Sequence, residues 1–192
     1  MKTLNQYIKE KLIINKDYHD NKIVIKTFDE LRKIIDDRYD KLGPGTKDNP
    51  IDFNDVDVSN IRSFCNDNGN KGIFEKTKFK YIDISDWDVS NITDMKYMFY
   101  DCEELESVGD LSNWNVSNVT DMNSMFCNCK ELEYVGDISE WDMSKVINMP
   151  FMFWYCTSFN QDLSCWNVSN VSDKVGMFYN CPIKEEYKPK FK

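Results

Sequence analysis

Residues 114–140 read WNVSNVTDMNSMFCNCKELEYVGDISE, and the preceding 27 residues, 87–113, read WDVSNITDMKYMFYDCEELESVGDLSN. Two further copies begin at Trp141 and Trp166, so that successive tryptophans are 27, 27 and 25 residues apart. A weaker copy, DVSNI at 57–61, precedes them. Repeats of this length are typical of proteins whose units stack on one another, because one unit cannot bury its own apolar side chains. The packing of these repeats therefore determines the architecture.

Each repeat contains a stripe of apolar residues at helical spacing, i, i+3, i+4 and i+7. In the second full copy the stripe follows a threonine, a residue type that caps helices: Thr120, then Met122, Met125, Phe126 and Cys129. A Val-Gly-Asp sequence, as at 135–137, then predicts a turn into a short extended segment. The expected fold class is α/β, a leucine-rich-repeat-like solenoid with a strand and a short helix per repeat. About four and a half repeats of 25–31 residues span residues 51–182, and a basic tail, 183–192, follows.

Four columns of residues recur through the four copies, and the four members of each column are identical. We expect them to form structural ladders in the core: Trp87, Trp114, Trp141 and Trp166; Met98, Met125, Met152 and Met177; Phe99, Phe126, Phe153 and Phe178; Cys102, Cys129, Cys156 and Cys181. The cysteine column could instead hold a metal ion through thiolates. Because the column lies on the apolar stripe, and a buried free cysteine behaves as a small hydrophobic residue, we expect packing, no metal site and no cofactor.

A column of Asp94, Asp121 and Asp173, with Asn148 in the third copy, falls where the first turn of each expected helix would lie. Carboxylates favour that end of a helix dipole, so a structural role is expected. Calcium bound between such columns stays an alternative, although the glycine-rich spacing of calcium-binding repeats is absent.

The first fifty residues, 1–50, are predicted to form a small N-terminal cap. We expect a helix over 3–13, a strand over 22–26, and a second helix that starts at the capping-box sequence Thr27–Glu30 and ends before Gly43–Pro44. A Gly/Pro-rich linker completes the segment. Its expected role is to shield the open apolar edge of the first repeat.

The repeat pattern W-[DN]-V-S-N-[VI]-T-D-M-x-x-M-F-x-x-C-x-x-L resembles that of the BspA-like leucine-rich-repeat surface proteins, in particular mycoplasma surface lipoproteins. The resemblance covers roughly two thirds of the chain and implies protein binding or adhesion. No signal peptide or lipobox is recognisable, which leaves the surface location in doubt. Residues 1–10, MKTLNQYIKE, resemble the capsid-targeting leader of internal proteins of T-even phages. That resemblance implies an alternative function, a phage-encoded virion structural or cargo protein.

Composition argues against several classes of function. The formal net charge is −9 for 192 residues and −11 over residues 51–192, whereas a nucleic-acid-binding protein needs a basic face. His19 is the single histidine, which argues against His-based metal sites and catalytic triads. No apolar run is long enough for a membrane helix, and no secretory signal is recognisable. We therefore expect a cytoplasmic or virion-associated protein, on a cell surface only by non-standard export, with free thiols.

We predict a non-enzymatic module for protein–protein interaction. Residues 84–181 contain 16 acidic residues and 4 lysines, and several glutamates after the stripe are placed to line one edge: Glu103, Glu104, Glu106, Glu131 and Glu133. Such an edge would attract a partner with a basic surface, or would serve only solubility. Large side chains at positions that vary between repeats are further candidates for partner contacts: Tyr97, Tyr100, Trp154 and Tyr155.

Overall fold

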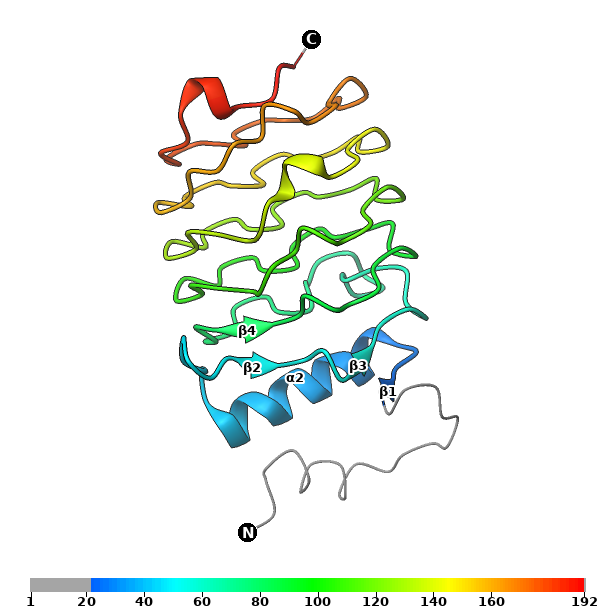
Figure 1. Ribbon diagram of the computed structural model, residues 1–192. Helices are drawn as coiled ribbons and strands as arrows, with labels where there is room; N and C mark the ends of the chain where they lie inside the picture. Colours follow the sequence, from blue (N-terminus) through cyan, green and yellow to red (C-terminus); the bar gives the residue numbers. More distant parts are fainter. Residues whose placement is uncertain (1–21, 192) are drawn as a thin grey trace.

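The computed structural model describes residues 22–191, in which the repeats are stacked one on another beside a long helix (Figure 1). The regular elements of this range are β1 (Ile23–Val24), α2 (Phe28–Leu42), β2 (Ile51–Asp52), β3 (Val56–Asp57), β4 (Ile82–Asp83) and the 3-10 helices η1 (Ile138–Glu140) and η2 (Glu185–Tyr187). β1 pairs in parallel with β3, with Ile23 opposite Val56, and β2 pairs in parallel with β4, with Ile51 opposite Ile82.

The predicted α/β solenoid of leucine-rich-repeat type, with a strand and a helix in every repeat, is wrong. Across residues 22–191 the structure has one α-helix and four two-residue strands in two two-stranded sheets. None of the helices expected in the repeats forms. The segments that carry the apolar stripe, such as 95–102 and 122–129, consist of turns instead.

Backbone angles and hydrogen bonds explain why the stripe is not helical. The N–H groups of Met98 and Cys102 donate to the carbonyls three residues earlier, whereas an α-helix uses the carbonyl four residues earlier. Tyr97 and Asp101 have φ angles of 60° and 62°, in the left-handed region that interrupts a right-handed helix. Consecutive turns therefore produce the stripe spacing. We call each such segment a turn ribbon: 95–102, 122–129, 149–156 and 174–181.

Each full repeat forms one layer of the stack. Layer 1 comprises residues 87–113, layer 2 comprises 114–140, layer 3 comprises 141–165 and layer 4 comprises 166–182. Parallel bridges join neighbouring layers at the Asp/Asn column: Asp94, Asp121, Asn148 and Asp173. The turn ribbons are joined as well, because N–H groups that do not close turns donate to carbonyls of the next layer, as from Phe126 to Met152 at 3.0 Å. Backbone hydrogen bonds thus connect layers that contain hardly any regular secondary structure.

The core runs through the interior of the stack. Phe99, Phe126 and Phe153 stack ring on ring, with centroids 5.3 and 5.5 Å apart, and all three are fully buried. The buried Trp114 donates its indole N–H to the carbonyl oxygen of Ile84, in the segment just before layer 1, at 3.2 Å. The phenylalanine column therefore joins neighbouring layers through ring contacts, and each tryptophan adds an indole hydrogen bond to backbone about 30 residues earlier in the chain, as from Trp141 to Leu111.

α2 covers the N-terminal end of the stack (Figure 1). Its capping box is formed, because the Thr27 side chain accepts the N–H of Glu30 and the Glu30 carboxylate accepts the N–H of Thr27, both at 3.2 Å. Arg38, on the buried face of α2, forms an ion pair with Asp55 at 2.7 Å. The predicted helix over 3–13 and the leader-like sequence within it lie outside the described residues.

Candidate protein-binding surfaces

The cysteine column is held in its protonated form by its surroundings. The Sγ atoms of Cys102 and Cys129 donate to the carbonyls of Phe74 and Phe99 in the preceding repeat, at 3.0 and 3.1 Å. Burial raises the pKa of Cys102 to about 11 and holds the pKa of Cys129 and of Cys156 well above the usual range. Within residues 22–191 no group of three or more His, Cys, Asp or Glu residues could hold a metal ion. These thiols are packing groups with little nucleophilic character.

Many aspartates bind the backbone of their own layer. The Oδ1 atom of Asp88 accepts the N–H of Ser90 at 3.0 Å, and hydrogen bonds from Ser90 lower the pKa of that carboxyl. The same turn, in which an aspartate accepts the N–H two residues later, recurs at Asp94, Asp110, Asp121, Asp137, Asp142, Asp162 and Asp173. The bridging column therefore stabilises turns, and its expected place in the first turn of a helix is wrong because no helix is present.

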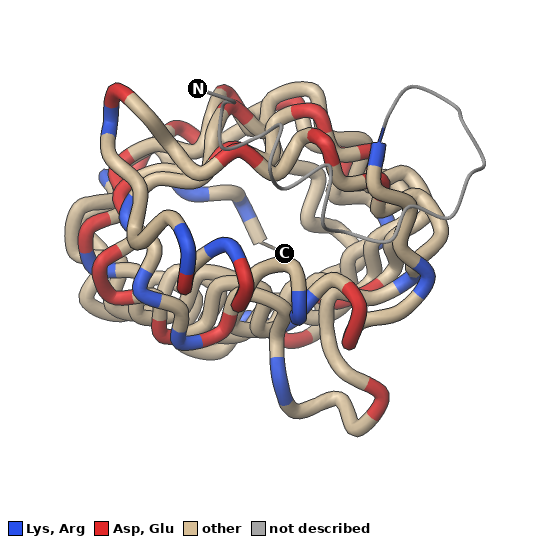
Figure 2. The backbone as a smooth tube through the Cα atoms, turned by 90° about the horizontal axis from the view of Figure 1, so that it is seen from below, with Lys and Arg blue, Asp and Glu red and all other residues tan. Residues whose placement is uncertain are grey.

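Two of the five glutamates of the predicted acidic edge form ion pairs with lysines in the described chain. Glu103 forms an ion pair with Lys130 of the next layer at 2.7 Å, which lowers the pKa of the Glu103 carboxyl through a hydrogen bond from that ammonium. Glu104 lies 3.8 Å from Lys78 and 3.9 Å from the Nζ atom of Lys80. Basic residues lie among the acidic residues around parts of the circumference of the stack (Figure 2). The edge is therefore a mixed surface.

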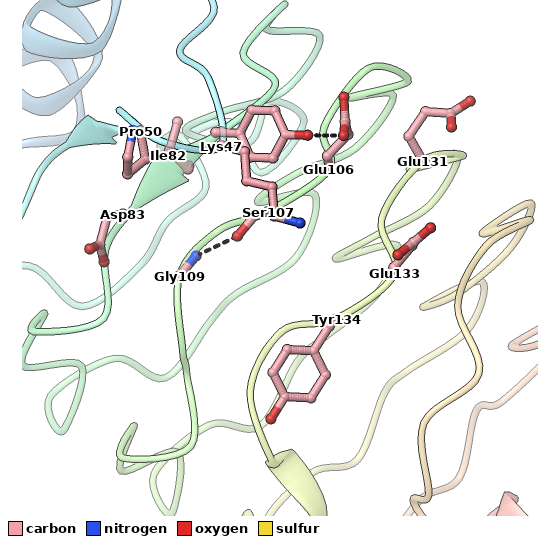
Figure 3. Close-up of a pocket in the computed structure, with 11 residues that line it drawn as sticks. Lys47, Pro50, Ile82, Asp83, Glu106, Ser107, Gly109, Glu131, Glu133 and Tyr134 are labelled. Atoms are coloured by element: carbon pink, nitrogen blue, oxygen red, sulfur yellow. Dashed lines mark hydrogen bonds between the residues drawn. The ribbon is translucent and has the colours of Figure 1, made fainter.

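Glu131 and Glu133 differ from the other glutamates of the edge. Both are exposed, and neither forms an ion pair with another residue in the 22–191 range. Together with Glu106 and Tyr134 they line a cavity of about 270 Å³ beside the end of β4 (Figure 3). The Glu106 carboxylate accepts a hydrogen bond from the Tyr81 hydroxyl, which raises the pKa of Tyr81. Carboxylates and phenol rings that surround an open cavity suit a basic side chain as ligand.

The outward positions of the turn ribbons place the four predicted aromatic residues in two groups. In layer 1 the rings of Tyr97 and Tyr100 meet edge to face, with centroids 5.7 Å apart. Layer 2 has the small residues Ser124 and Cys127 at the same two positions. Trp154 belongs to the ribbon of layer 3, so a whole layer separates it from Tyr100. The four residues therefore do not form one surface.

The second group is larger than the sequence indicated. Trp154 stacks on Tyr179 of layer 4, with ring centroids 4.2 Å apart, and meets Phe151 edge to face at 5.2 Å. Tyr155 lies 5.7 Å from Trp154 and 5.6 Å from Tyr179. We call these four residues the aromatic patch. A Cβ atom at Gly176 would lie 2.7 Å from the Trp154 ring, so that glycine is what allows the ring to lie against layer 4. The sequence did not lead us to Tyr179, although Tyr179 occupies the same position in its repeat as Tyr100 and Trp154 do in theirs.

A family model described as "Mycoplasma protein of unknown function, DUF285" matches residues 68–189. The chain belongs to this family. The DUF285 match includes the four layers and most of the tail, and its description names no function. No curated protein and no solved structure matches the chain. No helix in the described part of the chain is long and apolar enough to cross a membrane.

Proposed function

We propose that the protein is a non-enzymatic protein-binding module and that the aromatic patch is its contact surface. The observation that carries this proposal is the exposure of the patch: Tyr155 is 36% exposed, Tyr179 is 55% exposed, and the adjacent Val175 is 65% exposed. Clustered apolar surface of this kind is typical of interaction sites. Trp and Tyr are also the residue types that contribute most to binding free energy.

The packing of the patch suits binding with little loss of entropy. Trp154 is held between Phe151 and Tyr179, and its layer is fixed to the next by backbone hydrogen bonds, as from Tyr155 to Tyr179 at 2.9 Å. Rings that are ordered in the free protein lose less conformational freedom when a partner binds.

Charge favours a partner with a basic surface. Residues 84–181 contain 16 acidic residues and 4 lysines, and the carboxylates of Glu131 and Glu133 are free of ion pairs within the described chain. A negative field would speed the encounter with a basic protein, and the aromatic patch would supply the affinity. The resemblance of the repeats to BspA-like surface proteins supports the same class of function, because that resemblance implies protein binding or adhesion.

The test begins with the full chain as bait in lysate of the native cells, followed by identification and purification of the captured protein. Affinity for the purified partner is then measured for the wild type, for the double variant Trp154→Ala/Tyr155→Ala, and for Tyr134→Ala. Tyr134 is a 55% exposed tyrosine that lines the cavity beside Glu131 and Glu133, so this variant separates that cavity from the aromatic patch. We expect the double variant to bind at least about tenfold more weakly and Tyr134→Ala to bind as the wild type does.

Circular dichroism melts of the three proteins show whether each variant keeps its fold. A folded double variant with unchanged affinity would exclude the aromatic patch. Loss of binding in Tyr134→Ala alone would assign binding to the cavity that Glu131, Glu133 and Tyr134 line. A wild-type chain that binds no protein specifically would overturn the proposed function itself.

A further inference from the structure

The two ends of the stack are closed differently. At the N-terminal end, the guanidinium of Arg32 in α2 donates through Nη1 to the carbonyl oxygens of Ile73 and Glu75, at 3.1 and 3.4 Å. These carbonyls belong to the segment that precedes layer 1, and no earlier ribbon of the described chain lies against them. One side chain of the capping helix thus supplies the hydrogen-bond donors that a further layer would have provided.

The turn ribbons of layers 1–3 all use their backbone in the same way. Every second N–H donates to a carbonyl of the following layer; the donors are Met95, Tyr97, Phe99, Asp101, Met122, Ser124, Phe126, Asn128, Met149, Phe151, Phe153 and Tyr155. In layer 4 the equivalent N–H groups are those of Lys174, Gly176, Phe178 and Asn180. None of these four has an acceptor within the part of the chain that the structure describes.

The ribbon of layer 4 is nevertheless fully formed. The N–H groups of Met177 and Tyr179 donate to the carbonyls of Lys174 and Gly176 and so close the same turns as in the other layers. The four unpaired donors therefore form a regular edge with the spacing that a further ribbon would match. An edge with unpaired N–H groups is a template for an added segment of chain.

The C-terminal tail covers the opposite side of layer 4 and leaves this edge open. The carbonyl oxygen of Tyr187 accepts the N–H of Leu163 in layer 3 at 2.8 Å, in the place that the second half of a full layer 4 would take. Between the ribbon and the tail lies a cavity of about 580 Å³, with Met177, Phe178 and Phe191 in its lining. Phe178 and Phe191 are each only partly buried. The edge therefore combines backbone donors with apolar surface.

Positive charge gathers at this cavity. Lys174, Lys188 and Lys190 line it together with Glu185 and Glu186, and Glu185 is already paired with Lys188. The lining thus has a net positive charge on a chain whose formal charge is −9. The Nζ atom of Lys174 lies 4.3 Å from the centroid of the Phe191 ring, at the mouth of the same space. An acidic ligand is the complementary one.

We propose that the open edge of layer 4 binds a free, acidic segment of a partner protein, which folds into a further turn ribbon and adds to the stack as one more rung. Backbone carbonyls of the segment accept from the four unpaired N–H groups, and its apolar side chains enter the cavity. This mode of recognition is peptide addition at an exposed edge. The site lies next to the aromatic patch, with Tyr179 at the border, and it adds a second binding surface to the one proposed above.

A second copy of this chain does not fit the edge. Two C-terminal edges facing each other would oppose N–H groups to N–H groups. The N-terminal end of a second copy cannot serve either, because α2 covers it and Arg32 already donates hydrogen bonds to the carbonyl oxygens of Ile73 and Glu75. The partner must therefore bring a free stretch of backbone.

The test uses the full chain labelled with ¹⁵N and a capped synthetic peptide with the sequence of residues 119–129, in which serine replaces both cysteines. In the protein, the carbonyls of Asp121, Asn123, Met125 and Cys127 in this sequence accept from layer 1. Before addition, we expect the amides of Lys174, Gly176, Phe178 and Asn180 to exchange at least about tenfold faster than the matched amides of layer 3. Saturating peptide should slow the exchange of these four amides.

Charge is tested with two variants of the peptide, in which the two asparagines are replaced by aspartate or by lysine. We expect the aspartate peptide to bind more tightly than the lysine peptide, and the protein variant Lys174→Glu/Lys190→Glu to reverse that order. A scrambled peptide is the control for non-specific contact. Protection confined to the four amides together with this order supports the proposal.

Three outcomes would overturn it: no binding of any peptide, protection that centres on Tyr155 and Tyr134, or equal affinity of the aspartate, lysine and scrambled peptides. These outcomes are independent of the captured partner and of the aromatic patch. Failure at the edge therefore leaves the proposed function to its own test.

Discussion

Along one turn ribbon, inward and outward positions can be compared directly from layer to layer. The inward positions carry the same methionine, phenylalanine and cysteine in each layer, whereas one outward position carries Tyr97, Ser124, Phe151 and Gly176 in turn. Inward side chains contact their equivalents in the next layer, as in the phenylalanine stack at 5.3 Å. Outward side chains contact one another and solvent, except that the small Ser124 is buried. The stack thus fixes its architecture with one set of positions and leaves the adjacent set free for surface chemistry.

The largest effect expected from this comparison is on the phenylalanine stack. Phe126 is fully buried between Phe99 and Phe153, so Phe126→Ala should lower the free energy of unfolding by about 3–5 kcal/mol. The outward variant Asn123→Ala in the same layer should change it by less than about 0.5 kcal/mol. Urea denaturation followed by circular dichroism measures both. Equal losses would mean that the two sets of positions do not differ in the way described.

A smaller effect is expected at alkaline pH. Burial raises the pKa of Cys102 from 9.0 to about 11, so the folded state holds the thiol proton more tightly than the unfolded chain does. The contribution of Cys102 to the free energy of unfolding is therefore complete below pH 9 and is lost as the pH rises toward 11, by about 2–3 kcal/mol. Denaturation series across this pH window should show the decline. In Cys102→Ala the slope with pH should be shallower; an unchanged slope would assign the decline to other groups.

The smallest effect concerns the left-handed residues that form the ribbon. Asn128 has a φ angle of 62°, which alanine adopts at a cost and glycine adopts freely. Asn128→Ala and Asn128→Gly both lose the hydrogen bonds of the amide to Asp101 and Glu103, so their difference isolates the backbone term. We expect the alanine variant to be about 1 kcal/mol less stable than the glycine variant. Thermal denaturation of the two variants measures this difference. If the segment were helical, the alanine variant would instead have the higher thermal midpoint, because alanine stabilises a helix more than glycine does.

The repeat boundaries and the apolar stripe could be read from the sequence, but the type of element could not. Spacing at i, i+3, i+4 and i+7 fits a helix, and it equally fits consecutive four-residue turns. The distinguishing signal was the residue before each cysteine: Asp101, Asn128 and Asn180 are types that tolerate left-handed backbone, while Tyr155 is not. Helix formation was also disfavoured by competition, since half of the ribbon N–H groups bond to the next layer.

The candidate surfaces were predictable only in part, because a surface depends on which neighbours a fold brings near. The alignment of repeats placed Glu103 and Glu104 on one edge. It could not show that Lys78 and Lys80, from the segment before layer 1, would lie beside Glu104. Local spacing likewise suggested the pair Trp154 and Tyr155. The stacking partner Tyr179 comes from another layer, 25 residues after Trp154.

One feature of the turn ribbons also has an electrostatic consequence. In a β-sheet the N–H groups of a strand point alternately to its two neighbours, and their dipoles largely cancel. In layers 1–3, twelve ribbon N–H groups all point toward the following layer. Their dipoles therefore add along the axis of the stack as they do in an α-helix. The stacked turn ribbons therefore have a negative pole beside α2, where Arg32 lies, and a positive pole at layer 4. The field of the backbone itself draws anionic groups toward layer 4.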